Sequence, residues 1–271
     1  YMLNCIDANY KNGKAKFIVT GGTFTGFNPA YNGAEGEGTN FLADGYIAAE
    51  SVKNGKHIFT VKKAETVTSA DVLDDLCYNK KGAVIYINTP IVNETGSAAY
   101  CYNGGTRTIT LDKNGSLTSG KGCTLTVASG VTVNLNGLGG TISSPVTTES
   151  YNAAGTAIIY GGYFYAGKGT GTGVKAMAST IHLWGLQGMS TCNIYGGVFE
   201  CEGDAKYLLN CEDSYYKNGR CKFVIYGGIF VGFDPAESYS EGTTAINWVA
   251  DGYKSVKTTY NGKEAYQVVK K

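Results

Sequence analysis

The chain has few residues of the kinds that mark several common protein classes. Only 4 of its 271 residues are proline and 2 are tryptophan, and 23 Lys and Arg stand against 22 Asp and Glu. A duplex-binding surface needs a basic excess, which is lacking. No apolar run approaches the roughly 20 residues that span a bilayer. No Cys-x-x-Cys pair indicates a zinc or redox site. We therefore expect no nucleic-acid partner, no membrane span, no metal and no cofactor.

Glycine and tyrosine, by contrast, are abundant. There are 39 glycines and 21 tyrosines. The glycines do not recur at every third position, which excludes collagen. Together with Thr, Val, Ile and Asn, these residues suit short strands joined by tight turns. The composition predicts an all-β chain.

Residues 1–63 and 207–270 are two copies of one segment. The first copy begins YMLNCIDANYKNGKAKFIVTGGTFTGFNPA and the second YLLNCEDSYYKNGRCKFVIYGGIFVGFDPA. The repeat period is about 206 residues. We expect residues 1–63 to be the C-terminal part of a preceding unit and 64–271 to be one complete unit. Because the chain begins inside a repeat, we also expect it to be a piece of a longer protein.

A shorter motif, Gly-Gly followed by a β-branched or aromatic residue and Phe, recurs within the unit. Successive copies lie about 22 to 35 residues apart, which is the range of a solenoid coil. Glycine permits a sharp corner between strands, and the following Phe can stack on its equivalent one coil along. The pattern predicts a parallel β-solenoid of stacked coils. Its predicted corner glycines are Gly21, Gly22, Gly161, Gly162, Gly196, Gly197, Gly227 and Gly228.

One stretch has a helical pattern. Within residues 68–78, Val72, Leu73, Leu76 and Cys77 recur at helical spacing, and Thr68 with Asp71 approximates a capping box. We expect a short helix that covers the open end of the coil stack.

The segments LTVASGVTVNLNG, NIYGGVFECEG and FVIYGGIFVGFDPAESYSEGTTAINWVADGY carry a family resemblance. The chain resembles right-handed β-helix domains of gut bacteriophage tail fibres and of secreted surface proteins of gut bacteria such as Bacteroides relatives. The resemblance implies a right-handed, single-stranded parallel β-helix, which is a pectate-lyase-like solenoid. It implies an extracellular, structural or adhesive fibre segment without catalytic residues. It also implies a cell-surface glycan or protein receptor. Because an open solenoid end presents unpaired strands, we expect self-association, as a head-to-tail polymer or a homotrimer.

Two carbohydrate-directed functions remain as alternatives: a polysaccharide lyase or hydrolase, and a carbohydrate-binding module. The densest acidic group is Glu200, Glu202 and Asp204, although a solvated loop explains it equally simply. For binding, Tyr163, Tyr165 and Trp184 are the candidate surface aromatics, since rigid amphipathic rings suit sugars. Packing on a β surface is the competing interpretation of these rings.

The eight cysteines are interpreted as small apolar residues inside the solenoid. The alternative is a disulfide, for which Cys211 and Cys221 are the best candidates because they bracket a turn. In the first copy Ala15 stands where Cys221 would be, so Cys5 has no equivalent partner.

Overall fold

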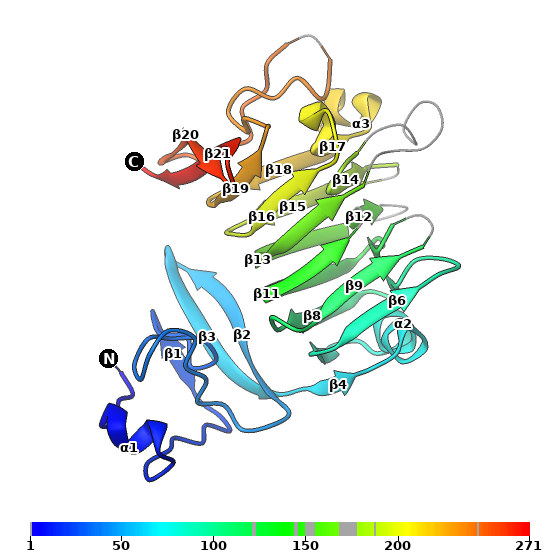
Figure 1. Cartoon of the computed structure of the whole chain (residues 1–271). Coiled ribbons are helices and arrows are strands. Elements are labelled where there is room, and N and C mark those ends of the chain that lie inside the picture. Colours follow the sequence, from blue (N-terminus) through cyan, green and yellow to red (C-terminus); the bar gives the residue numbers. More distant parts are fainter. Residues whose placement is uncertain are drawn as a thin grey trace. The chain divides into compact units, whose positions relative to one another are not determined.

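The computed structural model describes residues 2–120, 123–143, 146–149, 155–167, 178–186, 188–242 and 244–271 (Figure 1). The chain forms two compact units. Tyr1–Thr66 with Val84–Tyr86 form the first, and Val67–Ala83 with Ile87–Lys271 form the second. The chain is mostly β with parallel sheets, which confirms the all-β expectation. Among the described helices, none is long and apolar enough to cross a membrane.

The second unit contains a five-stranded sheet in which all neighbours are parallel. Its strands are β7 (Ala99–Cys101), β10 (Leu125–Val127), β12 (Val146–Glu149), β14 (Ile181–Trp184) and β17 (Leu209–Cys211), in that spatial order. Short strands with long connections between parallel neighbours require crossovers through other parts of the fold. Those crossovers run through the larger sheet.

The larger sheet holds two rows of parallel strands that share β11 (Val131–Ser143) and β13 (Gly155–Ala166). The first row consists of β8 (Gly105–Leu111), the first half of β11, the first half of β13, β15 (Ser190–Ile194) and β18 (Cys221–Ile225), in that order. The second row consists of β9 (Ser116–Ser119), the second half of β11, the second half of β13, β16 (Val198–Cys201) and β19 (Gly228–Val231), in that order. The remaining bounds are β5 (Val84–Ile87) and β6 (Pro90–Asn93).

The corner glycines of the second unit lie between the two rows, and their backbone explains the residue type. The second glycine of each pair has a positive φ, as in Gly197 (114°) and Gly228 (110°). In the last two pairs the first glycine also lies against the preceding strand. A Cβ on Gly196 would lie 2.7 Å from the Tyr160 carbonyl oxygen, and one on Gly227 would lie 2.3 Å from that of Tyr195. In these two pairs a side chain is therefore excluded at both positions, for two different reasons.

Two aromatic ladders run across neighbouring strands, one on each side of the corner glycines. Phe164, Phe199 and Phe230 are fully buried and stack with ring centroids 4.8 and 5.0 Å apart. On the other side of the corner, Tyr160, Tyr195 and Tyr226 stack at 5.4 and 4.6 Å. These spacings follow from the roughly 4.8 Å between neighbouring strands, which places equivalent residues directly above one another.

Helix α2 (Ala70–Asn79) confirms the expected helix but corrects its details. The N-cap is Ser69, whose hydroxyl accepts from the Val72 N–H at 3.4 Å, and not Thr68 of the expected capping box. Leu73, Leu76 and Cys77 are buried, whereas Val72 is 51% exposed and does not belong to the apolar face. The expected place of Val72 on the apolar face is therefore wrong, because packing buries only the face that carries Leu73, Leu76 and Cys77.

Arg107, on β8, is fully buried and holds the C-terminal end of α2. Its guanidinium donates to the carbonyl oxygens of Cys77 (2.9 Å), Gly104 (3.0 Å) and Tyr102 (2.8 Å). A carbonyl at a helix C-terminus lacks an intrahelical donor and carries partial negative charge, so a buried cation is stabilised there. Arg107 thereby joins α2 to the strands that follow it.

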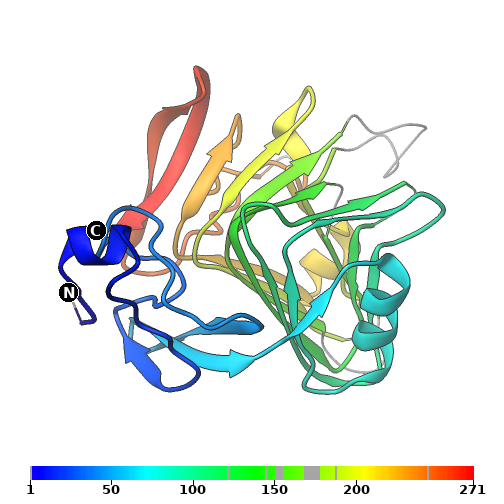
Figure 2. The same ribbon diagram turned by 60° about the horizontal axis from the view of Figure 1, so that its bottom comes forward.

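Two antiparallel hairpins were not expected from the sequence. They are β2 (Tyr46–Lys53) with β3 (Lys56–Lys63), and β20 (Tyr253–Tyr260) with β21 (Lys263–Lys270). Each turns at an Asn-Gly pair with positive φ, at Asn54-Gly55 and Asn261-Gly262. This is the strongest short hairpin signal, and it was present in both copies. Figure 2 shows the red β20–β21 hairpin beside β19, with which β21 pairs antiparallel.

The remaining elements also repeat between the copies. Helices α1 (Asp7–Lys11) and α3 (Asp213–Lys217) lie at equivalent positions. Strand β1 (Thr23–Thr25) pairs with β3 as β19 pairs with β21. The short elements β4 (Glu65–Val67) and the 3-10 helix η2 (Ala205–Tyr207) complete the described chain.

Candidate functional site

Tyr163 and Tyr165 project from the second half of β13, away from the apolar interior. They alternate with Phe164 and Ala166, which are buried. Their rings are stacked, with centroids 6.3 Å apart and planes at 17°. The period of two along a strand thus places both candidate aromatics on one face.

Glu200 joins these tyrosines from the neighbouring strand β16, where it lies in register with Tyr165. Its Oε2 accepts a hydrogen bond from the Tyr163 hydroxyl at 2.8 Å. Its Oε1 accepts from Lys263 Nζ at 2.5 Å. The Glu200 side chain is 9% exposed and that of Lys263 62% exposed. The pair therefore places a nearly buried carboxylate behind an accessible ammonium group.

These contacts set the charge state of the cluster. Burial raises the pKa of Glu200, but the hydrogen bonds from Lys263 and Tyr163 outweigh it and leave that pKa below its ordinary value. Burial, and then the hydrogen bond to Glu200, raise the pKa of Tyr163. At neutral pH the site is thus a carboxylate held by a neutral hydroxyl and a cation.

A concave pocket of about 440 Å³ lies beside this cluster. Its lining includes Glu200, Cys201, Asp204, Val231, Lys263 and Glu264. The lining combines acceptor carboxylates, one donor cation and a few apolar side chains. Tyr163 is hydrogen-bonded to the Glu200 carboxylate of this lining. Such a mixture suits a hydroxyl-rich ligand.

Two of the pocket's carboxylates are held in the charged form. The pKa of Glu264 is lowered by its hydrogen bonds from Lys257 and Tyr266, and that of Glu200 is also lowered. Both are therefore charged acceptors at neutral pH. Neither has the raised pKa that keeps the acid of a glycosidase protonated.

The acidic group predicted at residues 200–204 is only partly assembled. Glu200 and Asp204 line the pocket, whereas Glu202 is not part of its lining. Asp204 also caps η2, since its Oδ1 accepts from the Lys206 N–H at 2.9 Å. A cap of this kind explains an aspartate in a loop without a ligand.

Trp184 does not join the tyrosines. It lies at the end of β14 in the five-stranded sheet and is 38% exposed. On the same strand Ile181 and Leu183 are fully buried, as the period of two along a strand requires. His182, on the same face as Trp184, is largely buried, and burial lowers its pKa to about 4.

The alternative of a disulfide between Cys211 and Cys221 is not realised in this structure. Both are buried thiols, and the other six cysteines are free as well. Cys221 Sγ donates to the Leu183 carbonyl oxygen at 3.5 Å. A hydrogen bond with Cys211 lowers the pKa of Cys221, while burial raises that of Cys211. The bracketing of a turn brought the two thiols together but did not specify their oxidation state.

A repeated buried carboxylate was missed by sequence reasoning. Glu241 is 4% exposed, and its Oε1 accepts from the Cys211 N–H at 2.7 Å. Glu35, its equivalent in the first copy, accepts from the Cys5 N–H in the same way. Burial raises the pKa of Glu241 to about 7. The signal was available, because aligning the copies at a constant offset places Glu35 on Glu241.

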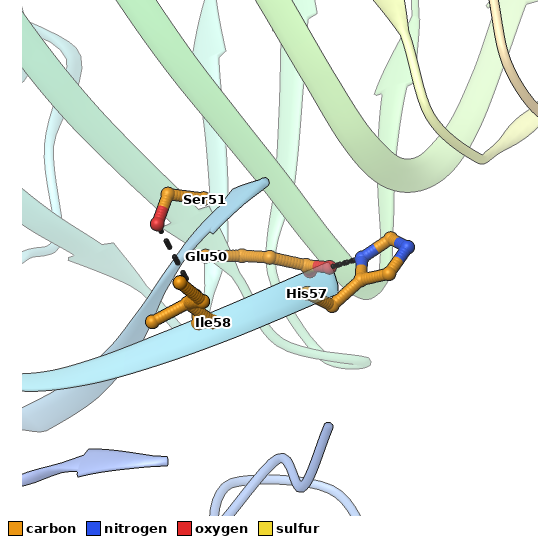
Figure 3. Close-up of polar contacts among 4 residues, drawn as sticks. All are labelled: Glu50, Ser51, His57 and Ile58. Carbon is orange, nitrogen blue, oxygen red and sulfur yellow. Dashed lines mark hydrogen bonds and ion pairs between the residues drawn. The ribbon is translucent and has the colours of Figure 1, made fainter. Parts of the chain in front are cut away.

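The hairpins carry a second repeated contact, with its charges exchanged. In the first unit His57 Nδ1 lies 2.5 Å from Glu50 Oε1 (Figure 3). At the equivalent positions of the second unit, Lys257 Nζ lies 2.5 Å from Glu264 Oε2. Burial raises the pKa of Glu50, which the His57 hydrogen bond opposes. A cross-strand pair is thus retained while its chemistry changes, which indicates a structural role in the hairpin.

Among the described residues, no group of three or more His, Cys, Asp or Glu side chains is placed to hold a metal ion. The chain matches no known protein family, no curated protein and no solved structure.

Proposed function

We propose that the chain is a non-enzymatic structural or adhesive segment of an extracellular fibre built of tandem β-solenoid repeats. The proposal extends to a phage tail fibre or a bacterial surface filament, on the resemblance of the YGGxF segments. The observation that carries it is the pair of aromatic ladders, Phe164–Phe199–Phe230 and Tyr160–Tyr195–Tyr226. Stacks of equivalent residues arise when one coil is laid on the next.

The order of strand pairing supports the solenoid. The chain passes from the five-stranded sheet to one row of the larger sheet and then to the other, as in β14, β15 and β16. It then returns to the first sheet with β17. Each such passage is one coil of the proposed β-helix. We propose the right-handed sense because parallel crossovers have that sense almost without exception.

The ends of this proposed coil stack are suited to a repeat unit. Helix α2 precedes the first parallel strands, and the β20–β21 hairpin pairs antiparallel with the last strand, β19. Covered edges protect a sheet from uncontrolled pairing. Fibre growth would then come from tandem units in one chain, with self-association added where an edge stays open.

Electron microscopy of the chain and of versions carrying one and two additional 206-residue units tests this proposal. The expected result is an elongated particle whose length increases by the same step with each unit. A particle whose longest dimension does not grow would refute the fibre function. Release of reducing or unsaturated sugars from gut polysaccharides would instead favour the enzyme alternative.

Glycan binding is the second candidate, and the pocket beside Tyr163, Tyr165 and Glu200 favours it. An adhesive fibre needs a receptor site, and these groups offer stacking and hydroxyl recognition. On a glycan array, Tyr165→Ala should weaken any binding by the chain about tenfold or more, a loss of about 1.4 kcal/mol. Tyr239→Ala, at an exposed tyrosine away from the pocket, is the matched control. Equal binding by both variants would reject this surface.

A further inference from the structure

The two copies of the repeat have different surroundings. In the second copy, β17, β18 and β19 pair in parallel with β14, β15 and β16. In the first copy, the equivalent residues 3–25 form no parallel strand pair of this kind within the described structure. The contacts internal to the copy are nevertheless retained. The isolated parallel bridge Val19–Leu42 reproduces Ile225–Val249, and the β1–β3 pairing reproduces β19–β21.

The side chains that the second copy buries against the preceding coil are accessible in the first. Met2 is 55% exposed, whereas its equivalent Leu208 is fully buried. Phe24 and Cys5 are partly exposed, and their equivalents Phe230 and Cys211 are buried. The first copy thus keeps the apolar pattern of a coil without the neighbour that covers it.

Gly21 provides independent evidence, because nothing in its own surroundings requires glycine. A Cβ at Gly21 would meet no atom within 4 Å, and its φ is not positive. At the equivalent Gly227, a Cβ would lie 2.3 Å from the Tyr195 carbonyl oxygen of the preceding coil. The glycine at position 21 makes physical sense only if a strand equivalent to that of Tyr195 lies against it.

A charged position shows the same difference. Lys263 reaches back to Glu200 of the preceding coil. Lys56, its repeat equivalent, is exposed and forms no ion pair among the described residues. The missing partner would be the counterpart of Glu200 on a preceding coil.

From these observations we infer that residues 2–27 form a docking edge for one defined partner: a solenoid coil equivalent to β14–β16, supplied by another repeat unit. This inference rests on the proposed tandem solenoid and specifies how successive units join. The partner coil would pair in parallel with residues 3–25, place its Phe199 equivalent on Phe24, and offer a carboxylate to Lys56. Thr23 and Thr25 replace Ile229 and Val231, so this junction is more polar than the one inside the second unit.

The test adds residues 64–206 in front of residue 1 of the full chain. Lys206 then precedes Tyr1 as it normally precedes Tyr207, and the added coil lies next to residues 2–27 in sequence. Amide hydrogen exchange is measured over residues 2–27 and over 208–233, in the chain itself and in the extended chain. The expected result is that exchange in residues 2–27 slows by about a hundredfold in the extended chain and approaches that of 208–233.

Gly21→Ala distinguishes docking from a general stiffening of the longer chain. In the chain itself the substitution should leave exchange in residues 2–27 unchanged, because the added Cβ meets nothing. In the extended chain it should reverse most of the gained protection, because the Cβ would meet the partner strand. Unchanged exchange in residues 2–27 of the extended chain, with 208–233 still protected, would overturn the docking inference alone. If residues 208–233 exchange as fast as 2–27 of the unextended chain, the solenoid function itself is wrong.

Discussion

The buried carboxylate of Glu241 should make stability depend on pH in a direction opposite to that of most acids. Its side chain is almost fully inaccessible, and one backbone N–H, from Cys211, is donated to it at 2.7 Å. Burial disfavours the charged form and raises its pKa to about 7, from an ordinary value of 4.5. The folded protein therefore binds this proton more tightly than the unfolded chain does.

The sign and size follow from proton linkage. A raised folded-state pKa gives stability that is fully present below the unfolded pKa and is lost as pH rises through the folded one. The window is therefore pH 4.5 to about 7. A shift of this size corresponds to at most about 3 kcal/mol of unfolding free energy, at 1.36 kcal/mol per pKa unit.

His182 acts in the opposite sense over nearly the same range. Burial lowers its pKa from 6.5 to about 4, so the folded protein binds this proton less tightly than the unfolded chain does. The unfolding free energy therefore decreases as pH falls from 6.5 to about 4. The two effects partly cancel in the unmodified protein. We therefore expect the wild-type unfolding free energy to change little between pH 4.5 and 6.5.

Urea unfolding of wild type, Glu241→Gln and Glu237→Gln across pH 4 to 8 separates the two effects. Glutamine mimics the neutral acid, so Glu241→Gln should gain up to about 3 kcal/mol relative to wild type as pH rises from 4.5 to 7. Glu237 is exposed and serves as the matched control, which should follow wild type. A constant difference between Glu241→Gln and wild type at all pH values would refute the assigned pKa and its cause.

Three further changes test packing and contacts in the second unit. Gly227→Ala should lower the unfolding free energy by about 1 to 3 kcal/mol through overpacking, whereas Gly21→Ala should not, as denaturant unfolding would show. Arg107→Met removes its hydrogen bonds to four carbonyl oxygens and should cost about 3 kcal/mol in the same assay, and a cost below about 1 kcal/mol would contradict its role. Tyr163→Phe removes a hydrogen bond from Glu200, so carboxyl NMR titration should show a higher pKa for Glu200. An unchanged titration would mean that this contact is absent in solution.

Several features were predictable because their physical cause is local in the chain. The repeat of residues 1–63 in 207–270 and the recurring Gly-Gly-x-Phe motif indicated short strands and corners. Positive φ at the second glycine is a property of the backbone at that residue. The Asn-Gly turns of the hairpins were equally local, although their significance was overlooked. The α2 segment was found for the same reason, because a helix brings together residues three and four apart.

The assembly of the candidate site could not be predicted in this way, because its parts meet only through the pairing of distant strands and the return of the β20–β21 hairpin. Glu200 and Lys263 are 63 positions apart, and Arg107 and Cys77 are 30 apart. Which residues of distant strands face each other depends on register and on the unequal lengths of the connections, neither of which a short motif encodes. The sequence by itself thus determined the β class, the repeat and the corners. Only the tertiary structure decided which carboxylates were buried and which cation reached Glu200, because these contacts join residues far apart in the chain.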